Sequence, residues 1–145
     1  MELVDRPAIE VIGLQVDAAF DDLATVVPAA WAQLFDRADA IIGRTGTTFL
    51  ELSTDLGDGR CRELVGAQVV GGTPPPAGML AELVYEARWV HELHHGPLED
   101  IGATFALMLD FLADQGLHAD GVKLDVGYGA DGPHDLYVRL AGPTP

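Results

Sequence analysis

Hydrophobic positions follow two different periods along the first half of the chain. Residues 9–16 and 47–54 are rich in β-branched and apolar side chains and predict strands, and residues 61–70 alternate again after the turn signal Asp58-Gly59. Between the first two of these strands, apolar residues recur at helical spacing and predict a helix over 27–40. That stripe consists of Val27, Ala30, Trp31, Leu34, Ala38 and Ile41.

The second half repeats this order of elements. The run Gly71-Gly72-Thr73-Pro74-Pro75-Pro76 is the strongest break in the chain and predicts a linker. A long strand over 79–93 follows, then a helix that starts at Gly96-Pro97 and ends at Gly116, and two strands over 121–128 and 134–140. We therefore expect one α+β domain over 1–145 that contains a duplicated βαββ unit. Its parts are a first repeat over about 3–70, a linker over 71–78 and a second repeat over about 79–141.

The segment at 79–95 has two interpretations with different functional consequences. Residues 91–95 read HELHH and satisfy the HExxH pattern of zinc proteases, which requires a helix so that His91 and His95 share one face. The same segment also alternates as a strand, with Tyr85 and Trp89 on its apolar face. In a strand His91 and His95 would lie about 13 Å apart, too far for one ion. Because Gly96-Pro97 would end a zincin helix at its second ligand, we favour the strand and expect no metal site.

Charge and composition restrict the classes of function. The chain has 145 residues, 8 Lys and Arg against 23 Asp and Glu, and a formal net charge of −15. Because nucleic-acid affinity depends on neutralising phosphates, direct binding of DNA or RNA is not expected. Cys61 is the only cysteine, so an intramolecular disulfide framework is excluded. The sequence has no signal peptide and no membrane-spanning run, and we expect a soluble cytoplasmic protein that does not bind membranes.

Several features, in their order along the chain, resemble the GyrI-like (gyrase-inhibitor-like) family. This bacterial family includes the effector-binding domains of drug-responsive transcription regulators. The resemblance covers nearly the whole chain and depends on the order of its parts rather than on one motif. Those parts are Arg6-Pro7, Pro28, Trp31, Gly66, Pro76-Ala77-Gly78-Met79, Trp89, His95-Gly96-Pro97, Asp114-Gln115-Gly116-Leu117 and the strand pair at 124–128 and 136–140.

The resemblance implies a fold and a kind of ligand. It implies one antiparallel sheet with two helices on one face and a central cleft that receives hydrophobic, often cationic, drug-like molecules. The family's cleft acid usually lies in an E-x-Y motif, whereas this chain has Asp125-Val126-Gly127-Tyr128. Strand alternation would send Asp125 and Tyr128 to opposite faces. The Tyr usual in the family's third strand is absent, and Glu63 is near its place.

These considerations give a set of candidate site residues. Glu63 is in phase with apolar neighbours in its strand, so it lies either on a solvated face or in the cleft, where an acid can hold a cation or move a proton. For an enzyme, Glu63 and Asp125 are the candidate catalytic bases. The remaining histidines (His94, His95, His118 and His134) are expected at the surface or in turns. The candidate ligand-binding residues are Trp31, Glu63, Tyr85, Trp89, His91, Asp125 and Tyr128.

Three functions remain open from the sequence. The first is a stand-alone GyrI-like protein that binds a hydrophobic or cationic drug-like molecule, as a sensor or as a sequestering antibiotic-resistance factor for several drugs. The second is a GyrI-like hydrolase that detoxifies a strained electrophilic natural product by carboxylate-assisted attack of water. The third is a protein that offers its acidic surface to a partner with a basic surface. No cofactor is expected for any of them.

Overall fold

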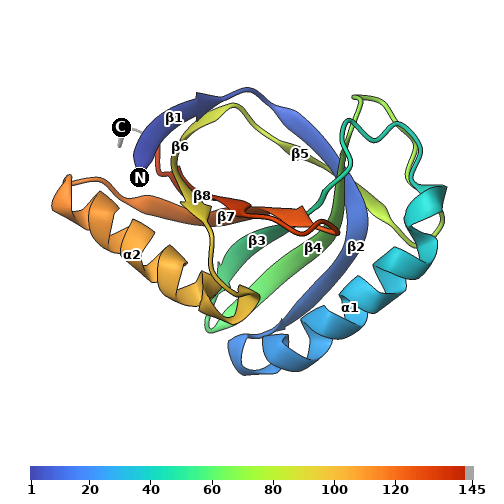
Figure 1. The fold of residues 1–145 in the computed structure, drawn as a ribbon, viewed down its shortest axis with the longest axis horizontal. Coiled ribbons are helices and arrows are strands. Elements are labelled where there is room, and N and C mark those ends of the chain that lie inside the picture. Colours follow the sequence, from blue (N-terminus) through green and yellow to red (C-terminus); the bar gives the residue numbers. More distant parts are fainter. Residues whose placement is uncertain (143–145) are drawn as a thin grey trace.

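The computed structural model describes residues 1–142, which form one antiparallel sheet and two α-helices (Figure 1). In the first half, Pro7 interrupts an extended segment, so two strands precede the first helix. A turn with positive φ at Asp58 joins the last two strands of this half. The elements are β1 (Glu2–Arg6), β2 (Ile9–Ala19), α1 (Leu23–Arg37), β3 (Phe49–Gly57) and β4 (Arg60–Val69).

The second half has the same order of elements. Its helix ends at Asp114, and Gly116 just after it has a φ of +72°, which lets the Leu117 N–H donate to the Leu112 carbonyl. Short 3₁₀ turns over Phe20–Asp22 and Leu98–Asp100 precede the two α-helices, and another over Ala38–Ala40 follows α1. The elements are β5 (Leu80–Val84), β6 (Ala87–His94), α2 (Ile101–Asp114), β7 (Ala119–Tyr128) and β8 (His134–Leu140).

The sheet is symmetric about its middle. Its strand order is β1-β6-β8-β7-β3-β4-β2-β5, so the equivalent strands β3 and β7 pair at the centre. At the ends, β1 pairs with β6 and β2 pairs with β5. The register is the same in both pairs: Glu2 lies opposite His91 in the first, and Gly13 lies opposite Leu80 in the second. β1 continues into β2, and β5 continues into β6. Each end of the sheet therefore contains one strand from each half of the chain, and the sheet curls into the ring visible in Figure 1.

Both helices lie on the same face of the sheet and diverge from each other (Figure 1). Trp31 and Leu34 of α1 pack on β2 and β4, and Met108 and Leu112 of α2 pack on β6 and β8. A third core fills the opposite, inner face of the ring, with Trp89 as its largest side chain. The middle strands β3 and β7 are therefore left without a helix directly above them. This architecture confirms the predicted α+β fold with two helices on one face.

Several element boundaries differ from the expectation, and strand β1 was not predicted. The first helix spans Leu23–Arg37 rather than 27–40, so Pro28 lies one turn inside it. The predicted strand over 79–93 is divided into β5 and β6 by a break at Tyr85 and Glu86, since the strand bends there to pair with β2 on one side and β1 on the other. The apolar alternation predicted through this segment is consequently wrong: Tyr85 lies in the break and is 68% exposed.

The HExxH residues do not lie on a helix. His91 and His94 belong to strand β6, and His95 follows its end. Within residues 1–142, no three His, Cys, Asp or Glu side chains are grouped as a metal site requires. The zinc-protease interpretation is therefore contradicted. Neither described helix is long and apolar enough to cross a membrane.

Candidate functional site

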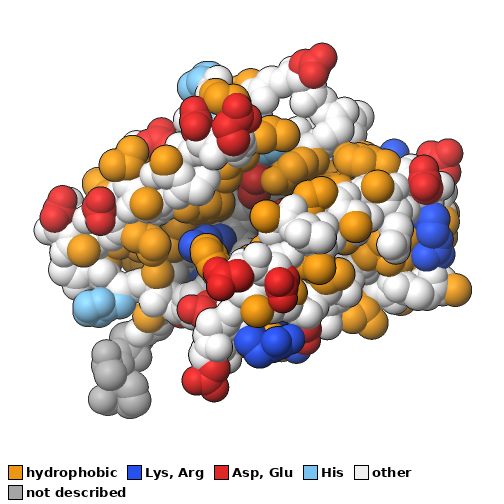
Figure 2. All heavy atoms as spheres, turned by 90° about the horizontal axis from the view of Figure 1, so that it is seen from below, with side chains coloured by type: hydrophobic (Ala, Val, Ile, Leu, Met, Phe, Trp, Pro, Cys, Tyr) orange, Lys and Arg blue, Asp and Glu red, His pale blue; other side chains and the backbone are white. Residues whose placement is uncertain are grey.

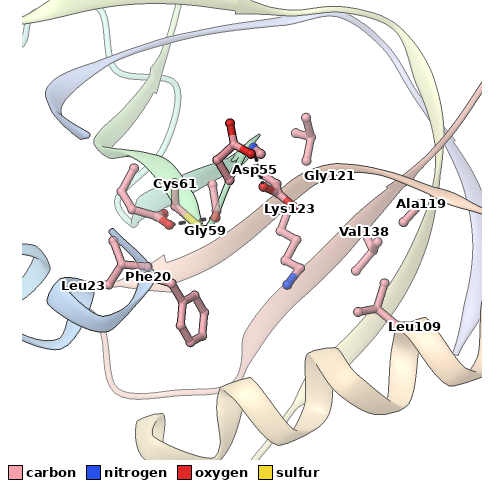
Figure 3. A pocket seen from close by; sticks show the side chains of 15 residues that line it. Phe20, Leu23, Asp55, Gly59, Cys61, Leu109, Ala119, Gly121, Lys123 and Val138 are labelled. Atoms are coloured by element: carbon pink, nitrogen blue, oxygen red, sulfur yellow. Dashed lines mark hydrogen bonds between the residues drawn. The ribbon is translucent and has the colours of Figure 1, made fainter. Parts of the chain in front are cut away.

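A hollow lies between the two helices, above the uncovered middle of the sheet. Hydrophobic side chains gather on both sides of it (Figure 2). It consists of a larger cavity of about 560 Å³ and a smaller one of about 260 Å³, which share Ser53 and Lys123 as lining residues. Phe20 and Leu109 contribute apolar surface to the larger cavity (Figure 3). We call this combined hollow the cleft.

The floor of the cleft is polar because alternate residues of three neighbouring strands face the helices. On β3, Leu50 and Leu52 belong to the inner core, so the residues between and after them face the other way. The same alternation on β7 buries Val122 and Leu124 in the inner core. The residues of the floor are Glu51, Ser53 and Asp55 of β3, Cys61 and Glu63 of β4, and Lys123 and Asp125 of β7.

Glu63 is the most unusual residue of the floor. Only 3% of its surface is exposed. Ser53 Oγ donates to its Oε1 at 2.8 Å, while its other oxygen, Oε2, is buried without a hydrogen-bond partner among the described residues. Burial, and then the negative charge of Glu51, raises the pKa of the Glu63 carboxyl to about 8. Near neutral pH this residue is therefore largely a neutral acid, whose carboxyl interacts with that of Glu51 as well as with Ser53.

Glu51 connects the floor to the aromatic wall on α1. The indole Nε1 of Trp31 donates to Glu51 Oε1 at 3.0 Å, and the Trp31 ring stacks on Tyr128 with centroids 4.2 Å apart. Burial raises the pKa of Glu51, although the hydrogen bond from Trp31 opposes this shift. Burial, and then the charge of Glu51, also raises the pKa of Tyr128, so its phenol stays protonated and can donate.

Asp125 is held by a buried histidine on the next strand. His134 Nδ1 lies 2.6 Å from Asp125 Oδ1, and both residues are about 5% exposed. Burial raises the pKa of Asp125, and the hydrogen bond from His134 opposes that shift. His134 was expected at the surface or in a turn, and this expectation is wrong. The same holds for His94, which is buried and lies 2.9 Å from both Thr104 Oγ1 and the Pro97 carbonyl.

Asp125 and Tyr128 line the same cavity, contrary to the prediction from strand alternation. The pairing of β7 with β3 shifts by one residue between Val126 and Tyr128, and Gly127 has a φ of +151°. This β-bulge returns Tyr128 to the face of Asp125. A side chain at position 127 would lie 2.8 Å from the His134 ring, so glycine is needed there for close approach as well as for conformation.

The sequence candidates fall into two groups. Trp31, Glu63, Asp125 and Tyr128 meet in or beside the cleft. Three others lie away from it, which corrects their expected place in the cleft: Trp89 fills the inner core, Tyr85 is exposed in the strand break, and His91 contacts Asp135 at 2.7 Å. Both faces of β6 are covered, one by α2 and one by the inner core, so apolar alternation in this strand could not identify the cleft side.

Several residues of the site were missed. Glu51 and Ser53 alternate with leucines in the strand over 49–57, and this alternation could have placed them beside Glu63. Lys123 is in phase with Asp125 and is the only lysine of the chain. His134 carried no such signal, because its contact with Asp125 depends on the pairing of β7 with β8.

No protein-family model matches the sequence, and no curated protein matches it significantly. Solved structures with the same fold do exist. SAV2435 bound to tetraphenylphosphonium has a TM-score of 0.76 at 9% identity, over 97% of this chain and 93% of the other. An integron cassette protein of Vibrio cholerae has a TM-score of 0.74 at 10% identity, over 97% and 95%.

A third structure is described as a hydrolase from Listeria innocua. Its TM-score is 0.61 at 16% identity, over 97% of this chain and 90% of the other. At such identities the likeness shows the fold and not the ligand. The architecture and these neighbours are consistent with the GyrI-like fold that the sequence resembles.

Proposed function

We propose that this chain is a GyrI-like protein that binds a hydrophobic, cationic small molecule in the cleft. The observation that carries the proposal is the pair of neighbouring acids Glu51 and Glu63 in the floor of cavities with apolar walls, of which Glu63 is only 3% exposed. Burial and the charge of Glu51 oppose ionisation of Glu63, which is why the pKa of its carboxyl is raised. A ligand that places a positive charge close to these acids would stabilise their carboxylate forms.

The walls of the cleft suit an aromatic or otherwise apolar ligand. Phe20 is 68% exposed at the mouth of the larger cavity, and Leu98 is 56% exposed beside the smaller one. Phe105 and Tyr128 add aromatic rings that can interact with a cation, each by about 0.5–2 kcal/mol. The protein of the same fold that was solved with tetraphenylphosphonium supports a ligand of this class.

Binding of a cation should be linked to loss of a proton. Because the pKa of Glu63 is about 8, the residue is mostly protonated at neutral pH. A positive charge beside it favours the carboxylate and lowers that pKa, so a proton leaves as the ligand binds. Affinity for a cation is then expected to increase as the pH rises toward and through about 8.

Titration calorimetry with tetraphenylphosphonium tests the proposal, with triphenylphosphine oxide as a neutral control of similar shape. We expect the wild type to prefer the cation and Glu63→Gln to lose roughly tenfold in affinity for it. The variant should bind the neutral control unchanged. Failure of the wild type to bind the cation, or equal affinity of wild type and variant for it, would overturn the proposal.

Cys61 allows the binding site to be located. It is the only cysteine of the chain and lines the larger cavity. Burial, followed by the charges of Glu63 and Asp55, raises the pKa of its thiol, so alkylation should be slow. Saturating tetraphenylphosphonium should slow alkylation further if it occupies the cleft. An unchanged rate would place the bound cation elsewhere on the molecule.

A hydrolase is the second candidate, favoured by the near-neutral pKa of Glu63 and by the hydrolase of the same fold. The Glu63 carboxylate would take a proton from water while the water oxygen attacks an electrophilic carbon. A strained C–O bond would then break, and the departing oxygen would take a proton from an acid such as Tyr128. Turnover of an epoxide that disappears in Glu63→Gln and in Asp125→Asn would support this function; binding without turnover would exclude it for that substrate.

A further inference from the structure

Lys123 has an unexpected position for the only lysine of an acidic protein. The chain has a net charge of −15, yet its single lysine lies in the middle of the cleft rather than on the outer surface. It lies directly opposite Ser53 of β3 and Val138 of β8, and its side chain extends from the sheet into the larger cavity (Figure 3). No other Lys or Arg lines either cavity among the described residues.

The ammonium of Lys123 is not neutralised by an ion pair. Within residues 1–142 it has no hydrogen bond and no salt bridge, and its one defined contact is the Phe105 ring, whose centroid lies 5.3 Å from Nζ. Glu63 and Asp125 are held instead by Ser53 and His134. Among the described residues, the cleft thus contains a positive group without an ion-pair partner together with several acids.

We propose that Lys123 makes the cleft selective for amphoteric ligands, which are hydrophobic molecules that carry an anionic group for Lys123 as well as a cationic group for the carboxylates. This inference rests on the proposed function and specifies its ligand class. A simple lipophilic cation must enter beside Lys123 and is repelled by it. A ligand with an added carboxylate turns that repulsion into attraction without losing its contact with the acids.

The two cavities give such a ligand room for both groups. Ser53 and Lys123 lie at the junction of the cavities, with Glu63 lining the larger one and Asp125 the smaller one. An anionic group at the junction therefore has an acidic residue of the floor on either side. The apolar remainder can lie against Phe20 and Leu109, which line the larger cavity.

The test uses two probes that share one cationic head group. These are pentyltriphenylphosphonium and (4-carboxybutyl)triphenylphosphonium, in which a carboxylate replaces the end of the alkyl chain. Titration calorimetry gives the ratio of their dissociation constants for each protein. We expect the wild type to prefer the carboxylate probe by roughly tenfold, and Lys123→Met to abolish or reverse that preference.

Three further variants show whether the charge at position 123 itself sets the preference. Lys123→Arg keeps the charge and should keep the preference, whereas Lys123→Gln should behave like Lys123→Met and replaces it if the methionine variant does not fold. Arg88→Met removes an equal charge from the exposed side of β6, outside the cleft, and should leave the ratio unchanged. Melting curves of all variants establish that each is folded.

The outcomes separate this inference from the proposed function. If both probes bind the wild type but their ratio is the same in the wild type, Lys123→Met and Lys123→Gln, the inference is wrong and the cation-binding function stands. If neither probe binds the wild type, the proposed function fails and the inference fails with it. An equal shift of the ratio in Arg88→Met would assign the effect to net charge and also overturn the inference.

Discussion

Single residues of the cleft floor differ in how their charge is compensated. Asp125 is paired with His134, and Glu51 accepts from Trp31, whereas the polar neighbours of Glu63 are Ser53 and a second acid, Glu51. Burial therefore shifts the pKa of Glu63 far enough, to about 8, for the residue to change its charge near neutral pH. We therefore expect the charge of Glu63 to link solution pH to both ligand binding and stability.

The pH dependence of stability should reveal this shift. An acid whose pKa is higher in the folded protein than in the unfolded chain binds more protons when folded, so the free energy of unfolding falls as the pH rises between the two values. For Glu63 this window runs from the ordinary glutamate pKa of 4.5 to about 8. Glu63→Gln removes the effect, because glutamine does not ionise.

Thermal melting of wild type and Glu63→Gln measures the difference directly. We expect similar melting temperatures near about pH 5 and a variant more stable by on the order of 5 °C near about pH 9. Carboxylates distant from Glu63 titrate alike in both proteins, so the difference reports Glu63 together with its neighbour Glu51. A difference that stays constant over this range would show that Glu63 has an ordinary pKa.

At the scale of elements, close backbone contact between β2 and β4 shapes the sheet. Gly13 and Gly66 face each other across these strands. A Cβ at Gly66 would lie 2.0 Å from the Ile12 carbonyl oxygen, and one at Gly13 would lie 2.1 Å from the Val65 carbonyl oxygen. Both obstacles are backbone atoms, so no side-chain rotation could relieve the clash. The glycine pair therefore allows the backbones of β2 and β4 to approach each other closely.

Gly66→Ala should therefore destabilise the protein by more than about 3 kcal/mol, because two strands must separate to admit one methyl group. Gly71→Ala, just after the same strand, is the matched control, since its Cβ would meet only Glu10 Oε2 at an ordinary 3.5 Å. That change should cost no more than about 0.5 kcal/mol. Urea unfolding of both variants provides the comparison, and equal midpoints would contradict the proposed role of the glycine pair.

The positions of the helices and strands could be predicted from the sequence better than the side of the sheet on which their residues lie. Helical spacing identified α1 and α2, and the turn signal at Asp58-Gly59 identified the β3–β4 hairpin, because these patterns are local. The side on which Tyr128 lies depends on a β-bulge, and the place of Trp89 depends on a sheet covered on both faces. Neither property is encoded in a single strand. Glu63 could be singled out because it alternates in step with apolar residues of its own strand. Its contacts, however, depend on the register in which β3 pairs with β4.

At the scale of the whole molecule, the repeated order of elements in the two halves of the chain determines where the site lies. Glu51, Ser53 and Glu63 come from the first half, whereas Lys123 and Asp125 come from the second. They meet because β3 and β7 pair at the centre of the sheet, where the diverging helices leave the strands uncovered. Neither half could form this cleft alone, and closure of β1 on β6 and of β2 on β5 holds the halves in place.

The charge of the whole molecule should also affect how fast a ligand arrives. A net charge of −15 attracts cations over distances set by the ionic strength, and the screening length falls from about 30 Å at 0.01 M salt to about 3 Å at 1 M. We expect the association rate of tetraphenylphosphonium to fall several-fold between about 0.02 M and about 0.5 M sodium chloride. Because Trp31 stacks on Tyr128 beside the cleft, stopped-flow tryptophan fluorescence provides the signal. Triphenylphosphine oxide is neutral and should associate at a rate independent of salt; a parallel fall for both probes would show that salt acts on the protein and not on the approach of the cation.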